Sequence, residues 1–345
     1  MDIQMRYAAI ALLAALSLAP MASWAQSDVE VSIPSGDAVL AGTLTLPESP
    51  ARAAVVLIQG AGPHGRNQII SGTPMFKELA EGLAEQGIAS LRIDNAGVGA
   101  STGPRVQHFK QREPHILAAF DALAQRNDLQ NVPLGLIGHS EGALVASSIW
   151  ADRKDAVAFM VLLGAPSRQG RAVWVEQQSN PARFPDHSPE DHQRLRAAFD
   201  VIAEASIAAD RAAVAAGVDR LFDLARATPE EIAENKTDFV DRMASQEMQV
   251  WLSHDPAPVF GQITDPTLLV WGDADSLTSP LQNLPVFLAK KNPAAEMTFI
   301  VLPHEDHFFL RGEGFAPGQH RAGAMSLSPA IVKTISDWIA VQAVD

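Results

Sequence analysis

The stretch 134–146 of the chain, LGLIGHSEGALVA, places Ser140 between Gly138 and Gly142. An apolar run ends at the first glycine, and small residues with helical spacing follow the second. A strand, a sharp turn and a helix with a serine at the apex are typical of a nucleophile elbow. So tight a turn brings the second residue before the serine against the second residue after it, and only small residues fit there. The stretch therefore predicts a serine at the end of a sheet strand, in the position of a nucleophile.

Composition excludes several classes of protein and of site. With 345 residues, 47% of them hydrophobic, the chain can bury one large core or two modest ones. Its net charge of −14, without a basic stripe, argues against a nucleic-acid partner. The chain has no cysteine, which excludes disulfides, thiolate catalysis and zinc–thiolate sites. We expect no metal and no cofactor.

The N-terminus resembles a secretory signal peptide over residues 1–25. Arg6 precedes an uncharged apolar run over 7–18, Pro20 breaks that run, and small residues flank Trp24 before a cleavage point after Ala25. The run is shorter than the roughly 20 apolar residues that span a bilayer, which favours cleavage over a permanent anchor. We therefore expect an exported protein, periplasmic or secreted, without a stable membrane anchor after cleavage.

Strands and helices alternate along most of the remaining chain, which predicts an α/β fold with a mostly parallel sheet covered on both faces. The expected strands are an edge hairpin at 29–33 and 38–46, then 53–59, 89–93, 132–137, 156–163, 267–271 and 297–302. The expected helices are 76–86, 114–124, 141–151, 281–290 and 329–341.

The alternation stops over residues 167–260, where only helical patterns occur. Ser188 and Thr228 each precede a proline and an acidic residue three positions on, as helix starts do. Because strands resume afterwards, we interpret the segment as a helical cap inserted into one domain over 26–345, not as a separate C-terminal domain.

A serine hydroxyl is a poor nucleophile at neutral pH and needs a histidine base that a carboxylate orients. Behind a nucleophile elbow the acid and then the histidine follow in chain order, each after a strand. Asp273 and Asp275 both follow the strand 267–271. Asp275 is favoured as the acid because Gly272 must first turn the chain out of the sheet, and Asp273 remains the alternative.

Two histidines compete for the role of base after the strand 297–302. His307 is favoured over His304 because two phenylalanines follow it to hold the loop, and because its longer reach suits a return over the sheet. As metal ligands the pair is weak, since no third donor lies at a known spacing. His139, inside the elbow, is expected to point away from Ser140 and to have a structural role.

A tetrahedral intermediate needs two backbone N–H donors where its negative charge develops. Glu141 supplies one at the start of a helix, where the helix dipole also favours an anion. The turn GAGPHG after the strand 53–59 supplies the other, with Ala61 favoured and Gly60 next. This turn lacks the lysine and the spacing of a phosphate-binding loop.

The combined motifs are far more specific than the elbow alone. The segments concerned are LIQGAGPHGRN (57–67), LRIDNAGVGASTG (91–103), GHSEG (138–142), HDP (254–256), WGDADSLTSP (271–280) and LPHEDHFF (302–309). With them the chain resembles the α/β-hydrolase superfamily, and is most similar to capped bacterial serine esterases related to the serine-aminopeptidase-like hydrolases. The resemblance implies that Ser140 is the nucleophile, Asp275 the acid and His307 the base. The chain departs from the family at Ala96, where an arginine is frequent, and at Asp306, where asparagine commonly precedes the base.

These observations predict hydrolysis of a small-molecule carboxylic ester through an acyl-enzyme. The same residues could cleave peptides or thioesters, and a binding protein that has lost activity is a further alternative. A helical cap over the elbow would line an apolar pocket for the acyl group. The candidates for that lining are Trp174, Phe222, Met243, Met248 and Trp251.

Overall fold

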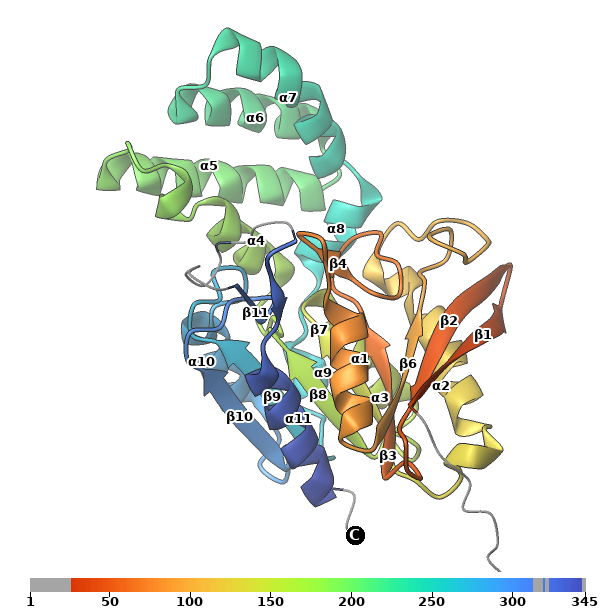
Figure 1. The fold of residues 1–345 in the computed structure, drawn as a ribbon. Helices are drawn as coiled ribbons and strands as arrows, with labels where there is room; N and C mark the ends of the chain where they lie inside the picture. Colours follow the sequence, from red (N-terminus) through yellow and green to blue (C-terminus); the bar gives the residue numbers. More distant parts are fainter. Residues whose placement is uncertain (1–25, 313–318, 320–322, 343–345) are drawn as a thin grey trace, which may run out of the picture.

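The computed structural model describes residues 26–312, 319 and 323–342, so the expected signal peptide lies outside the described residues. An eight-stranded sheet in the order β1-β2-β6-β3-β7-β8-β9-β10 forms the centre of the molecule (Figure 1). β1–β2 and β2–β6 pair antiparallel, and all the other neighbours pair parallel. The strands are β1 (Ser27–Ser35), β2 (Ala38–Leu46), β3 (Ala53–Ile58), β6 (Ile88–Ile93), β7 (Leu134–His139), β8 (Phe159–Leu163), β9 (Thr267–Gly272) and β10 (Met297–Leu302). The predicted edge hairpin and mostly parallel α/β fold are confirmed.

Helices cover both faces of this sheet, and every residue of β3, β6 and β9 is buried. One hydrophobic cluster joins one face to α2, α3, α9 and α10, and a second joins the other face to α1 and α11. These helices are α1 (Met75–Glu85), α2 (Glu113–Ala124), α3 (Glu141–Asp152), α9 (Ala257–Phe260), α10 (Pro280–Lys290) and α11 (Pro329–Gln342). Continuous apolar strands are what a parallel sheet covered on both faces requires. The loops after the parallel strands meet at one edge of the sheet.

Two strand boundaries near the elbow differ from the prediction. β7 begins at Leu134, not at 132, and continues to His139, so the strand leads directly into Ser140. β8 begins at Phe159, not at 156, because the residues before it form a turn in which two N–H groups donate to the carbonyl of Arg153. The proline before β7 has no N–H to pair and stands outside the strand.

Helices α4–α8 stand beyond the sheet edge where these loops meet, and they have a hydrophobic cluster of their own (Figure 1). They are α4 (Gly170–Gln178), α5 (Pro189–Ile207), α6 (Arg211–Ala225), α7 (Pro229–Met243) and α8 (Gln246–Ser253). Capping boxes at Ser188 and Thr228 begin α5 and α7, each with a proline in the first turn. Phe260 packs in the cluster of the sheet instead, so the separate helical cluster ends before α9.

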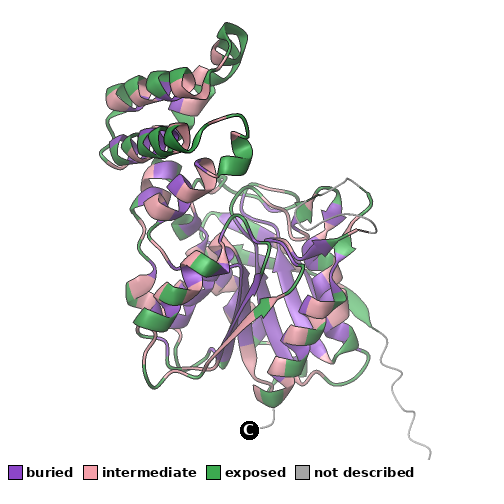
Figure 2. Cartoon of the chain, turned by 90° about the vertical axis from the view of Figure 1, so that its left-hand side faces the viewer, coloured by how far each residue is buried: buried purple, intermediate pink, exposed green. Residues whose placement is uncertain are grey.

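Burial differs between the two parts: the sheet is largely buried, whereas the outer surfaces of α5–α7 are largely exposed (Figure 2). Within the described ranges, no helix combines the length and the apolar character that crossing a membrane requires.

Candidate active site

Ser140 stands between β7 and α3 with φ 55° and ψ −121°. A left-handed φ costs a non-glycine residue about 1–3 kcal/mol. The Ser140 N–H donates to the carbonyl of Leu163 (2.7 Å), which helps to hold this conformation. A Cβ at Gly138 would lie 2.4 Å from the carbonyl oxygen of Gly142, and one at Gly142 would lie 2.2 Å from that of Ile58. The predicted tight turn is confirmed, because no side chain fits at either glycine.

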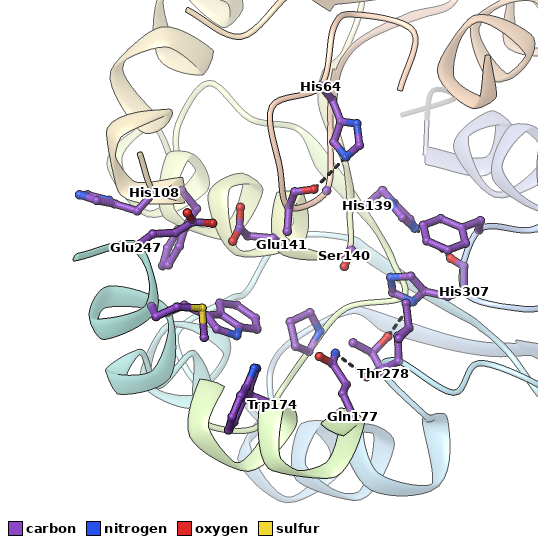
Figure 3. A pocket seen from close by; sticks show the side chains of 18 of the residues that line it. His64, His108, His139, Ser140, Glu141, Trp174, Gln177, Glu247, Thr278 and His307 are labelled. Atoms are coloured by element: carbon purple, nitrogen blue, oxygen red, sulfur yellow. Dashed lines mark hydrogen bonds between the residues drawn. The ribbon is translucent and has the colours of Figure 1, made fainter. Parts of the chain in front are cut away.

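Asp275 and His307 follow neighbouring strands, β9 and β10, and the structure brings them into contact. His307 Nδ1 lies 2.8 Å from Asp275 Oδ2. Asp275 Oδ1 accepts the N–H groups of Leu277 (2.9 Å) and Thr278 (2.7 Å), and Oδ2 accepts the Thr278 hydroxyl (2.9 Å). Since Nδ1 faces the aspartate, Nε2 is the nitrogen available to Ser140, which lines the same cavity as His307 (Figure 3).

The competing residues lie outside this arrangement. Asp273 is exposed, and its Oδ1 accepts the backbone N–H of His304 (2.8 Å), which is itself exposed. Neither residue lines the cavity that contains Ser140. The geometry therefore favours Asp275 and His307 over the alternatives.

Electrostatics keep the Asp275 carboxylate ionised although it is buried. Burial alone would raise its pKa, but the charge of His307 and hydrogen bonds from His307 and Thr278 outweigh this and hold the pKa below its ordinary value. A permanently charged carboxylate at Nδ1 fixes the tautomer of a histidine base and stabilises its imidazolium form.

The N–H groups expected to stabilise an oxyanion surround Ser140. Glu141 is the first residue of α3, and Ala61 follows β3; both line the cavity with Ser140. The Gly60 N–H already donates to Gln68 Oε1 (2.8 Å). Of the two predicted donors in this turn, Ala61 is therefore the one that remains available.

A cavity of about 260 Å³ lies over these groups, between the sheet edge and helices α4 and α8 (Figure 3). Trp174, Met248 and Trp251 line it, as expected. The prediction for Phe222 and Met243 is corrected, because neither lines this cavity; both pack in the hydrophobic cluster of helices α4–α8. Helical spacing identified their apolar faces, but α6 and α7 turn those faces toward the neighbouring helices.

Sequence reasoning missed Gly164 and the partners of His139, which help to hold the site together. Gly164 has φ +54°, and a Cβ there would lie 3.0 Å from His307 Nδ1. His139 is buried: its Nε2 lies 2.9 Å from the His307 carbonyl oxygen, and its Nδ1 lies 2.9 Å from Gln68 Nε2. Burial, together with the charge of His307, lowers the pKa of His139 to about 3, so this ring is neutral at physiological pH. The structural role expected for His139 agrees with these contacts, and the glycine directly after β8 was a visible signal for Gly164.

Metal-ligating side chains do not gather in the part of the chain that the structure describes: no group of three or more could hold an ion. The two histidines of the HxxH motif, which are weak candidates for a metal site, differ in their surroundings: His307 faces Asp275, and His304 is exposed.

Comparison with known proteins agrees with this architecture. The family model of the alpha/beta hydrolase fold matches residues 54–310. The esterase EstD of Thermotoga maritima is 22% identical over 302 residues, which cover 87% of this chain and 65% of that relative, so the chain spans less than two thirds of its length.

Two solved structures share the fold at low sequence identity. Est1E from Butyrivibrio proteoclasticus, with ferulic acid bound, has a TM-score of 0.54 at 15% identity and covers 91% of this chain and 100% of its own. Proline iminopeptidase from Mycobacterium smegmatis has a TM-score of 0.54 at 16% identity, and the match covers 91% of this chain and 99% of that protein's chain. Given the match of the family model to most of the sequence, this chain belongs to the α/β-hydrolase fold family.

Proposed function

We propose that this protein is an exported serine hydrolase that cleaves carboxylic esters through an acyl-enzyme. One observation carries the proposal: His307, held by the buried Asp275, and the strained elbow serine Ser140 border the same cavity. The esterase name of the Thermotoga relative supports the ester as the substrate class.

In this mechanism His307 Nε2 removes the proton of the Ser140 hydroxyl as its oxygen attacks the acyl carbon. The tetrahedral oxyanion accepts hydrogen bonds from the N–H groups of Glu141 and Ala61. When the intermediate collapses, the carbon–oxygen bond to the alcohol breaks, and the imidazolium protonates the departing alkoxide. A water molecule, deprotonated by His307, then attacks the acyl-enzyme; collapse releases the carboxylic acid and restores the Ser140 hydroxyl.

Helices α4–α8 are proposed to act as a cap that selects the acyl group. Trp174 and Met248 line the cavity from these helices. Ser140 lies apart from Trp174 in the same cavity (Figure 3), and the acyl carbon would react there. A cavity of about 260 Å³ is slightly smaller than most ligand sites, which span about 300–1,000 Å³. We therefore expect short acyl groups to be preferred.

Turnover of p-nitrophenyl esters of increasing acyl length, beside aminoacyl p-nitroanilides, tests the reaction class. We expect ester turnover that exceeds anilide turnover and falls by about 10⁴-fold or more in Ser140→Ala. Ser147→Ala is the matched control, because this buried α3 serine donates to the Ala143 carbonyl (2.8 Å) and does not line the cavity. Faster anilide than ester turnover would reassign the protein as a peptidase. Unchanged ester turnover in Ser140→Ala would refute the mechanism.

Export is tested separately, by expressing the full chain in a Gram-negative host and sequencing the N-terminus of the protein in the periplasm. Cleavage after Ala25 predicts that the mature chain begins at Gln26. Retention of Met1 in the cytoplasmic fraction would contradict export.

A further inference from the structure

Arg112 is a buried cation that the proposed mechanism does not use. It precedes α2, its side chain is 3% exposed, and burial lowers the pKa of its guanidinium. Taking a cation out of water is unfavourable unless hydrogen bonds and an opposite charge compensate for the lost hydration. Because burying this charge is unfavourable, the presence of Arg112 here indicates a role beyond ordinary packing.

The hydrogen-bond partners of the Arg112 guanidinium all belong to the two segments that carry the expected oxyanion donors. Nη2 donates to the Gln59 carbonyl oxygen (2.6 Å), and Nη1 donates to the Gly60 carbonyl oxygen (3.0 Å), both in the turn after β3. Nη1 also donates to Glu141 Oε1 (3.3 Å) at the start of α3. One guanidinium therefore joins the turn after β3 to the helix that begins behind Ser140.

The contact with Gly60 determines where the Ala61 N–H points. The peptide group between these residues is planar and trans, so its carbonyl and its N–H point in opposite directions. Arg112 holds the carbonyl of that peptide, and Gln68 Oε1 holds the other side of Gly60 by accepting its N–H (2.8 Å). The Ala61 N–H must then point away from Arg112, and Ala61 lines the cavity of Ser140.

We propose that Arg112 is a positioning residue that holds the Gly60–Ala61 peptide and the start of α3 in the orientation that forms the oxyanion hole. This inference rests on the proposed function, because it assigns the support of that site's oxyanion donors. Arg112 touches no reacting atom in this account; it acts through the two backbone segments.

A simpler role is charge neutralisation of Glu141, whose pKa is raised by burial, against the influence of Arg112. The two roles make different demands on the side chain. Neutralisation needs one positive charge, which lysine supplies as well. Holding two adjacent carbonyls and a carboxylate needs the planar fork of donors that arginine has and lysine lacks.

Four variants separate these roles: Arg112→Met, Arg112→Lys, Glu141→Gln and the Arg112→Met/Glu141→Gln double variant. Positioning predicts that kcat for a p-nitrophenyl ester falls about 10²–10³-fold in Arg112→Met, the loss expected for one oxyanion donor. KM should change by less than about threefold, since the interaction acts in the transition state. The affinity for an alkylboronic acid, which mimics the tetrahedral intermediate, should fall in parallel with kcat. Recovery of kcat in Arg112→Lys or in the double variant would overturn the proposal in favour of neutralisation.

Arg92→Met controls for the loss of a buried arginine. Arg92, in β6, is 1% exposed and donates to Asn67 Oδ1 and Thr45 Oγ1, and none of these three residues lines the cavity. We expect it to lower the melting temperature while kcat of the folded enzyme stays within about threefold, as for a change outside the site.

A crystal structure of Arg112→Met gives a readout that does not depend on activity. The proposal predicts that the Gly60–Ala61 peptide rotates or becomes disordered, and an unchanged peptide would contradict it. If the wild-type protein and Ser140→Ala turn over esters equally, the proposed function fails, whereas this structure still decides the role of Arg112.

Discussion

The loops at the sheet edge and helices α4–α8 both contribute side chains to the cavity of Ser140, yet they are held differently. Asp275 and His307 are 3% and 4% exposed and follow strands of a sheet packed on both faces. In α7, by contrast, Val240 and Met243 are the buried residues among fifteen. Residues on packed elements keep a defined geometry, whereas sparsely packed helices can vary or move at lower cost. Under the proposed function, the sheet edge carries the chemistry and the helices select the substrate.

The largest effect is expected from the carboxylate that holds the base. Asp275→Asn should lower kcat for esters by about 10⁴-fold, because the amide no longer fixes the tautomer of His307 or stabilises its charge. Asp273→Asn is the matched control, since Asp273 is exposed and lies in the same loop. We expect it to retain activity within about tenfold, as a surface change does. An equal loss of kcat in Asp275→Asn and Asp273→Asn would contradict the assignment of Asp275 as the acid.

A smaller loss should follow from crowding the base without changing its chemistry. Gly164→Ala places a Cβ 3.0 Å from His307 Cε1 and Nδ1. A displacement of about 1 Å in a catalytic group can cost about 10²-fold in rate. Steady-state kinetics of the folded variant measure this loss.

Gly36→Ala isolates the backbone strain of that substitution. Gly36 has φ +55°, close to the +54° of Gly164, and a Cβ there would meet nothing within 4 Å. Both variants should lose about 1–2 kcal/mol of stability from the left-handed conformation. Only Gly164→Ala should lose activity. If Gly164→Ala and Gly36→Ala had similar kinetics, a contact of the added Cβ with His307 would not explain the loss.

A change in selectivity, not in chemistry, is expected from the helices. Trp174→Leu should widen the cavity and raise kcat/KM for a longer acyl ester relative to the acetate ester by about tenfold, the lower range for one methylene in an apolar pocket. Phe222→Leu, within the same helical cluster but away from the cavity, should leave the ratio unchanged. Steady-state kinetics with a series of p-nitrophenyl esters of increasing acyl length measure this ratio of kcat/KM values. If Trp174→Leu instead lowered kcat for all esters equally, the division between the two regions would be wrong.

The stability of the protein against acid, not its activity, is expected to depend on His139. The pKa of His139 is lowered by burial from 6.5 to about 3, so below pH 6.5 the unfolded state binds a proton that the folded state does not. This residue therefore contributes a loss of stability as pH falls from 6.5 toward about 3, at most about 1.4 kcal/mol per pH unit.

Urea unfolding at several pH values measures that slope. In His139→Gln, stability should decrease less steeply with falling pH than in the wild type, whatever the stability at neutral pH. His304→Gln, at an exposed histidine, is the control and should keep the wild-type slope. An unchanged slope in His139→Gln would show that this ring is not held neutral in the folded state.

Much of the fold and the positions of the candidate site residues could be predicted because the signals are local. Ser140 follows its apolar strand directly, and Asp275 and His307 each come within a few residues of the end of theirs, with glycine, proline or aromatic residues beside them. The order of the elements then implies that the loops after parallel strands meet at one edge.

The supporting contacts could not be predicted because they join distant parts of the chain. Arg112 reaches Gln59 across 53 positions, and His139 reaches the His307 carbonyl across 168. No local pattern marks such partners. In the helices the difficulty is different: periodicity shows that Met243 lies on an apolar face, but not whether that face meets the cavity or another helix.

Labelling with a fluorophosphonate tests the central claim, that Ser140 is the nucleophile activated at the sheet edge. Mass spectrometry of the labelled, digested protein should find one adduct on the peptide that contains Ser140. Ser140→Ala should carry none, and Ser147→Ala should label as the wild type does. An adduct on another residue, or undiminished labelling of Ser140→Ala, would contradict the account.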